Sequence, residues 1–184
     1  GVIRTMTTAI NTKTSSVLLD KDGRSVFPAG VHHYVYAFLS RYVDSLLGST
    51  SMKVGDTSRG YQRFLEWGKK SVYTDLEAIC MLPVVFFPDG AHNPILFRDH
   101  AIHTWLVKKG RQRVTDSDLY KQKVEKYPQL AELSIEHFFF QYIHTSEIQG
   151  ILQEAIQDII ADYGKPNSPY KYYSAVSYTH LTLP

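Results

Sequence analysis

The amino-acid sequence predicts a mainly α-helical fold with a small β-hairpin, at the helix-rich end of the α+β class. Three observations support this prediction. Apolar residues recur at helical spacing in several segments. Capping residues precede these segments, and Gly or Pro follows them. Only two short stretches, near residues 17–27 and 84–87, have the strand-forming or turn residues that predict a β element.

The clearest helix is predicted in "SEIQGILQEAIQDIIADYGKP". Its apolar residues form one stripe: Ile148, Ile151, Leu152, Ala155, Ile156, Ile159 and Ile160. Ser146 with Gln149 forms a capping signature at the start, and Gly164 and Pro166 end the helix.

Further helices are predicted from the same signals along the chain. Gly48 ends the first of them, Thr74 with Glu77 forms a capping box, and Pro83 ends that segment. The segments between these helices, including "STSMKVGD" at residues 49–56, are predicted to be loops. The predicted helices cover residues 31–48, 57–70, 74–82, 94–110, 116–127 and 134–144.

Length and composition set limits on the kind of protein. The 184 residues fit one domain or one lobe, and the net charge of +2 leaves nucleic-acid contact to local patches. A single cysteine, Cys80, excludes an internal disulfide, and no apolar stretch in the sequence is long enough to span a membrane. The chain lacks an initial Met, and "VSYTHLTLP" resembles translated adaptor sequence. We therefore expect a fragment of a longer reading frame whose residues 176–184 are non-native.

One group of residues weakly suggests a metal site, and other candidate residues are predicted to have structural roles. His100 and His103, with Asp99 beside them and His92 nearby, have a spacing that can share a metal, although eight histidines produce such pairs by chance. Cys80 is predicted to be a buried, inert thiol on an apolar helix face. The helix that begins near residue 116 is predicted to have an Asp or Ser cap, and Asp116 and Asp118 are predicted to serve at this helix start rather than to bind a metal. No glycine-rich phosphate loop and no Gly-x-Ser-x-Gly motif is present.

Two basic clusters give a stronger signal. The segment "KKGRQR" places Lys108, Lys109, Arg111 and Arg113 at a helix end. These cations can complement the helix dipole or contact a phosphate backbone. A second cluster also contains two Lys and two Arg residues. Aromatic residues lie between them and can stack on bases or pack in the core. This second cluster comprises Arg59, Arg63, Lys69 and Lys70, with Tyr61 and Trp67.

The segment "AINTKTSS" at residues 9–16 resembles the fourth palm motif of viral RNA-dependent RNA polymerases. "HHYVYAFLSRY", "VGDTSRGYQRFL", "DLEAICML", "HNP" and "TWLVKKG" follow in an order similar to the thumb region of picobirnavirus-like and partitivirus-like members. The likeness spans roughly residues 5–113. In that family the "FLxR"-type stretch borders a β-hairpin, whereas periodicity predicts a helix there. Either one prediction is wrong or "SVLLDKDGRSVF" is the hairpin.

The resemblance implies a C-terminal polymerase fragment. Residues 1–30 would be the end of the palm, 31–175 a helical thumb, and 176–184 a non-native tail. Lys13 would protonate the pyrophosphate leaving group, which is reasonable chemistry at a triphosphate. RNA template and product would contact basic residues: Arg41, Arg59, Arg63, Lys108, Lys109, Arg111 and Arg113.

The same resemblance implies the cofactor and setting. The two Mg²⁺ ions would be held by upstream residues that this chain lacks, so the fragment would be inactive alone. Its other ligands would be nucleoside triphosphates. It would not contact a membrane and would act in the host cytoplasm or virion.

Two alternatives belong to other classes. One is a non-enzymatic helical module of phage or mobile-element origin, which binds nucleic acid or protein through residues 108–113 and the aromatic helices. The other is a metal hydrolase built on His92, His100 and His103, which would bind Zn²⁺ stoichiometrically.

Overall fold

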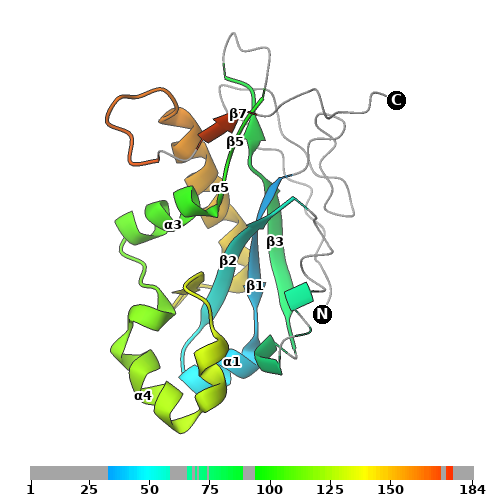
Figure 1. Ribbon diagram of the computed structural model, residues 1–184, viewed down its shortest axis with the longest axis vertical. Helices are drawn as coiled ribbons and strands as arrows, with labels where there is room; N and C mark the ends of the chain where they lie inside the picture. Colours follow the sequence, from blue (N-terminus) through cyan, green and yellow to red (C-terminus); the bar gives the residue numbers. More distant parts are fainter. Residues whose placement is uncertain are drawn as a thin grey trace.

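The computed structural model describes residues 33–58, 66–67, 69, 71–73, 75–88, 94–170 and 173–175. These residues form an α+β fold with four α-helices and two antiparallel sheets (Figure 1). The expected mainly α fold is therefore wrong, and so is the helical, thumb-like lobe expected for residues 31–175. The strands β1 (Tyr34–Leu39), β3 (Glu77–Pro83), β5 (Ile95–Phe97) and β6 (His137–Phe139) occupy segments that were predicted to be helical.

The main sheet has four strands in the order β3-β1-β2-β6, and all neighbours are antiparallel. The strands are β1 (Tyr34–Leu39), β2 (Ser51–Thr57), β3 (Glu77–Pro83) and β6 (His137–Phe139). The register sets Lys53 opposite Phe38 of β1 on one side and opposite His137 of β6 on the other. Because paired residues share a face, Lys53 is placed within an aromatic face of the sheet.

Two helices pack beside each other against this sheet, α3 (Asp99–Lys108) against β2 and α5 (Thr145–Ala161) against β3 (Figure 1). Their apolar stripes complete the core with the sheet. The Trp105 indole Nε1 of α3 donates a hydrogen bond of 2.8 Å to Asp158 Oδ2 of α5. Helices α1 (Arg41–Leu47) and α4 (Asp118–Lys126) contact each other at one end of the sheet.

The second sheet, in the order β4-β5-β7, lies at the opposite end of the molecule from α1 and α4 (Figure 1). Its strands are β4 (Val85–Phe86), β5 (Ile95–Phe97) and β7 (Tyr173–Ala175). The rings of Phe86, Phe97, Tyr163 and Tyr173 contact one another around it. The β element predicted near residues 84–87 is confirmed. Three short 3₁₀ helices complete the described elements: Ser71–Tyr73, Val114–Asp116 and Pro128–Glu132.

The helix predicted over residues 31–48 is half correct. Its first part is β1, every residue of which is buried, and only Arg41–Leu47 is helical. Ser40 divides the two parts, because its side chain accepts from Val43 N and caps α1. Gly48 ends the helix as predicted, in the left-handed conformation with φ 74°.

Three other predictions are wrong. The predicted helices at 74–82 and 134–144 contain β3 and β6. These two strands are buried on both faces, so they lack the alternation that distinguishes a strand from a buried helix. The predicted loop at 49–56 contains most of β2, because turn-forming residues there obscured the strand. The helix predicted over 94–110 is correct from Asp99 onward, but β5 precedes it.

The helices α4 and α5 are confirmed, although the cap of α5 differs from the predicted one. The cap of α4 was predicted to be an Asp or Ser, and it is Ser117, which accepts the capping hydrogen bond from the Tyr120 N–H. His144 and Glu147, rather than Ser146 and Gln149, form the capping box of α5. The β element predicted near 17–27, most of the helix predicted over 57–70, and residues 176–184 lie outside the described residues.

Two glycines offer a matched test of the packing. A Cβ on Gly55 of β2 would lie 2.4 Å from the Tyr36 hydroxyl, whereas a Cβ on the exposed Gly150 of α5 meets nothing within 4 Å. We expect Gly55→Ala to destabilise the fold by roughly 1–3 kcal/mol through overpacking. Gly150→Ala should stabilise it by about 1 kcal/mol through helix propensity. Urea unfolding measures both, and equal effects of the two changes would contradict the register of β1 with β2.

Tyr142, in the loop between β6 and α5, has a φ of 64°. The left-handed conformation costs a non-glycine residue about 1–2 kcal/mol. Glycine removes this strain but adds roughly 0.5–1 kcal/mol of unfolded-chain entropy. We therefore expect Tyr142→Gly to be more stable than Tyr142→Ala in urea unfolding by roughly 0.5 kcal/mol. A glycine variant less stable than the alanine variant would show that this backbone is not strained.

Candidate functional site

Five charged residues meet where β2, the start of α3 and the start of β6 come together. We call this group the ionic cluster: Lys53, Asp56, Arg98, Asp99 and Glu136. The residues come from segments far apart in the sequence, and Lys53 and Asp99 are almost completely buried. Buried charges are rare in proteins unless they are paired or functional.

Lys53 stands at the centre of this cluster, and its side chain is fully buried. Its ammonium group forms an ion pair with Glu136. It also lies 4.0 Å from the ring centroid of Trp67 and 5.2 Å from that of Tyr36. An ammonium group can be buried at this position because a carboxylate and two π faces replace its water.

Asp56, three residues along β2, anchors the start of α3. Its carboxylate accepts from Arg98 Nε at 2.8 Å, Arg98 Nη2 at 3.2 Å and the Asp99 backbone N–H at 3.0 Å. His33 Nε2 lies 3.3 Å from the same carboxylate. Burial raises the pKa of Asp56, but the hydrogen bonds from His33 and Arg98 outweigh it and hold the pKa well below the ordinary value. Asp56 is therefore a permanent anion.

Asp99 and Glu136 form a hydrogen-bonded carboxyl pair. Burial, followed by the charges of Asp56 and Glu136, raises the pKa of Asp99 to about 7. Burial also acts on Glu136, but the charge and hydrogen bond of Lys53 hold its pKa below the ordinary value. The pair therefore holds one proton near neutral pH, mainly on Asp99, and can gain or lose it at small cost.

Neutral side chains border the cluster. His103 Nε2 lies 2.6 Å from the Val54 carbonyl oxygen, and burial lowers the pKa of His103. Burial and the charge of Lys53 lower the pKa of His137 to about 3, so this ring is neutral at pH 7. The Tyr73 hydroxyl lies 3.4 Å from both nitrogens of the His137 ring. Among the described residues, Lys53 therefore carries the buried positive charge of the cluster.

The cluster is open to solvent at one edge. The Arg98 side chain is 56% exposed and the Glu136 side chain is 28% exposed, whereas the Lys53 side chain is fully buried. Glu136 thus connects the buried pair to the surface. A ligand that meets Arg98 and Glu136 can exchange a proton with a buried carboxyl group.

The predicted basic run adjoins this opening. We call residues 108–113 the basic segment; it follows α3 directly. Arg113 Nε donates to the carbonyl of Ile135, the residue before Glu136, at 3.1 Å, and its guanidinium lies 5.2 Å from the Phe138 ring. Arg111 lies 4.9 Å from the Phe140 ring and Lys109 lies 5.4 Å from the Trp105 ring. Within the described residues, no carboxylate pairs with any of the four cations of this segment.

The other predicted site residues are not brought to this place. Arg41 begins α1 at the far end of the sheet, 3.9 Å from Glu77 Oε2. Lys69 is exposed and Trp67 contacts Lys53. The other residues predicted to take part in catalysis, nucleic-acid binding or metal binding lie outside the described residues: Lys13, Arg59, Tyr61, Arg63, Lys70 and His92.

The geometry of His100 and His103 gives little support to the metal site predicted from their spacing. The His100 and His103 rings are 6.5 Å apart at an interplanar angle of 89°, and His103 faces the Val54 carbonyl. Across the described ranges, no group of three or more His, Cys, Asp and Glu side chains is arranged to hold a metal ion. Cys80 is buried as predicted, although in β3 rather than in a helix, and burial raises the pKa of its thiol to about 12. None of the helices described here has the length and apolar character needed to cross a bilayer.

Four of the five cluster residues were not predicted from the sequence: Lys53, Asp56, Arg98 and Glu136. The available signal was "SMKVGD", in which a Lys and an Asp flank a Val-Gly pair, but the turn-forming residues around it predicted a loop. Glu136 lies 83 positions from Lys53, and no local pattern connects the two.

Comparisons with models of protein families, with curated proteins and with solved structures found no match to this chain.

The carboxyl pair gives a pH dependence that Asp99→Asn should remove. The folded protein keeps a proton on Asp99 up to about pH 7, whereas the unfolded chain releases it near pH 4. The stability contribution of this group is thus greatest below pH 4 and falls as pH rises to 7. Asparagine stays neutral and can still donate to Glu136.

We therefore expect Asp99→Asn to gain stability over the unmodified protein between pH 4 and 7, by on the order of 2 kcal/mol. Urea titrations at several pH values measure this difference. Asp44, whose pKa burial raises to about 6, titrates equally in both proteins and cancels. Parallel stability curves for the two proteins would show that Asp99 titrates normally.

Proposed function

We propose that this chain binds nucleic acid along the basic segment and hydrolyses a phosphodiester bond at the Asp99–Glu136 pair. The observation that carries the proposal is the Asp99–Glu136 carboxyl pair, which lies next to Arg113 of a basic segment whose cations have no carboxylate partner among the described residues. Charge draws a polyanion to this edge, and the pair supplies acid–base chemistry there.

Binding depends on cations that are not neutralised by neighbouring carboxylates. Lys108 and Lys109 are exposed at the end of α3. The guanidinium groups of Arg111 and Arg113 lie near the faces of buried aromatic rings, which limits their conformational freedom. Such contacts neutralise phosphates without reading sequence. The low net charge of the whole chain is compatible with this, because only one edge takes part.

Hydrolysis of a phosphodiester requires a base for the attacking water and stabilisation of the charge that develops on phosphorus. Glu136 is ionised, partly exposed and able to accept a proton. Asp99 holds a proton near neutral pH, and the pair can pass it to the oxygen that leaves when water attacks phosphorus and the bond from phosphorus to that oxygen breaks. Arg98 is the exposed cation at the opening, and the buried Lys53 keeps Glu136 ionised. The buried floor lowers the local dielectric and strengthens each of these interactions.

The polymerase fragment is a second candidate, supported by the ordered resemblance over residues 5–113. It shares nucleic-acid binding with the first candidate but assigns the chemistry to Lys13 and to upstream Mg²⁺ ligands. The two differ in their requirements: hydrolysis needs only nucleic acid and water, whereas polymerisation needs nucleoside triphosphates and the upstream palm. Extension of a primed RNA template by a longer chain that included palm motifs with Mg²⁺ ligands would favour the polymerase.

Binding is tested by fluorescence anisotropy with labelled DNA and RNA over a range of salt concentrations. We expect Lys108→Gln with Lys109→Gln to weaken binding and to lower the slope of log affinity against log salt by about 2. The matched control is Lys121→Gln with Lys126→Gln, which removes two exposed cations from α4. An equal loss in the control would mean that binding is not located at the basic segment.

Cleavage is tested on the same oligonucleotides, in Mg²⁺ and in EDTA, by gel electrophoresis of the products. We expect Asp99→Asn to lose at least about 100-fold in cleavage rate while binding persists, since acid–base groups contribute about 10²–10⁴-fold. Asp116→Asn, an exposed acid outside the cluster, should cleave normally. If the unmodified protein binds but leaves every substrate intact, the hydrolytic half of the proposal is wrong.

A further inference from the structure

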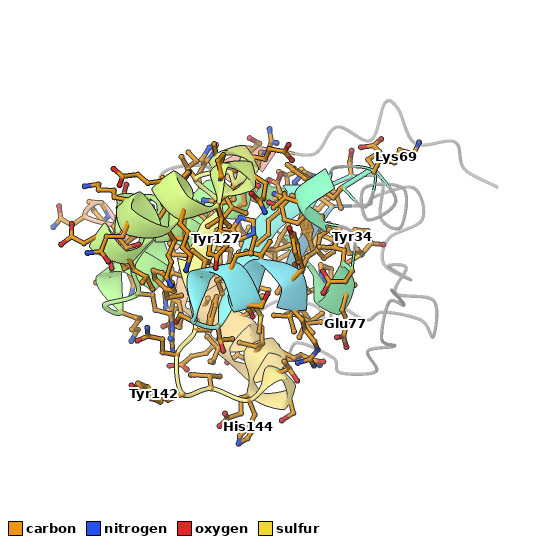
Figure 2. The ribbon with its side chains drawn as sticks, turned by 90° about the horizontal axis from the view of Figure 1, so that it is seen from below. Tyr34, Lys69, Glu77, Tyr127, Tyr142 and His144 are labelled. Atoms are coloured by element: carbon orange, nitrogen blue, oxygen red, sulfur yellow. The ribbon has the colours of Figure 1, made fainter. Side chains whose placement is uncertain are left out.

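Tyr142 combines two unusual properties. Its side chain is fully exposed, at 101% of the reference area, and its backbone is in the left-handed conformation with φ 64°. Figure 2 shows it standing away from the body of the protein, on the same side as His144. Strained backbone of this kind persists when the surrounding structure imposes it, and it often marks a functional site.

The residues on both sides of Tyr142 are fixed. The Phe140 N–H donates to the Thr50 carbonyl at 3.0 Å, and Gln141 Nε2 donates to Ser49 Oγ at 3.0 Å. On the other side Ile143 packs against the core, and the His144 N–H donates to Glu147 in the capping box of α5. The loop therefore presents the ring from an ordered backbone rather than from a loose end.

The loop also lies beside the basic segment. The Phe139 N–H donates to the Gln112 carbonyl at 3.1 Å, and the Arg111 guanidinium lies 4.9 Å from the Phe140 ring. An exposed aromatic ring therefore stands two residues from a ring that Arg111 covers. A cation that contacts phosphate and an aromatic face that contacts a base together form the usual surface for unpaired nucleic acid.

We propose that Tyr142 stacks on an unpaired base of the nucleic acid that the basic segment holds, so that the chain prefers single strands, or junctions with an unpaired end, over continuous duplex. This inference rests on the nucleic-acid binding proposed above and adds the ligand class. A duplex has its base faces already stacked and offers an exposed ring no partner, whereas an unpaired base does. Tyrosine has only two side-chain torsions, so ordering it on the ligand costs little entropy.

The position of Tyr142 also limits how long a nucleic-acid strand must be to reach both Tyr142 and Glu136. Glu136 lies six residues before Tyr142, at the other end of β6. At a rise of about 3.3 Å per residue the two are separated by at most roughly 20 Å along the chain. One ligand strand a few nucleotides long can therefore reach both the basic segment beside Glu136 and the Tyr142 ring.

The test measures the affinity of the full chain for a short single-stranded oligonucleotide and for the same sequence as a duplex. We expect Tyr142→Ala to lose about tenfold for the single strand and little for the duplex. Tyr142→Phe, which keeps the ring and removes the hydroxyl, should bind as the unmodified protein does. Tyr142→Gly, which also removes the ring but relieves the backbone, should behave as the alanine variant does.

The outcomes separate this inference from the proposed function. If the unmodified protein binds duplex and the Lys108/Lys109 variant weakens it, while Tyr142→Ala leaves the single-strand affinity within twofold, base stacking is overturned and the proposed binding stands. Equal losses for single strand and duplex in Tyr142→Ala also overturn stacking. Absence of binding to either ligand by the unmodified protein overturns both.

Discussion

The Asp56 carboxylate is the contact on which the arrangement of this fold depends most. It lies near the end of β2 and accepts hydrogen bonds from the side chain of Arg98 and the backbone of Asp99. These bonds fix where α3 begins relative to the sheet. The start of α3 in turn places Asp99 against Glu136, and the end of α3 places the basic segment beside β6. The positions of the acidic pair and of the basic run, which are separate in the sequence, are thus both set by one anchored helix.

Burial of Lys53 is the second constraint, and it is opposed by desolvation. Removing an ammonium group from water costs several kcal/mol unless partners replace the water. Glu136, Trp67 and Tyr36 do so here, and His137 stays neutral beside it. A hydrophobic residue at this position would avoid the cost altogether. The effect of this buried charge that the structure does show is on Glu136, whose pKa Lys53 holds below the ordinary value.

The parts of the structure that the sequence could predict are those determined locally. The helix α5 follows from its own apolar stripe, and α4 from a polar segment bounded by a cap and by Pro128. The strand β3 was mistaken for a helix because Thr74 and Glu77 mimic a capping box and because a strand buried on both faces has no alternation. The basic segment was predicted from its composition. The carboxyl pair was not predicted. Asp99 was considered only as a possible metal ligand, and Glu136 lay in a segment that was expected to be helical.

The long separation between Lys53 and Glu136 also bears on how the chain is made. Glu136 is synthesised 83 residues after Lys53. At about 5–20 residues per second the ribosome needs roughly 4–17 s to supply it. During that interval β1 can pair with β2 and with β3, but Lys53 of β2 still lacks the carboxylate of Glu136. We therefore expect the Lys53 ammonium group to stay partly hydrated during synthesis. It becomes buried only when β6 emerges and joins the sheet as its fourth strand.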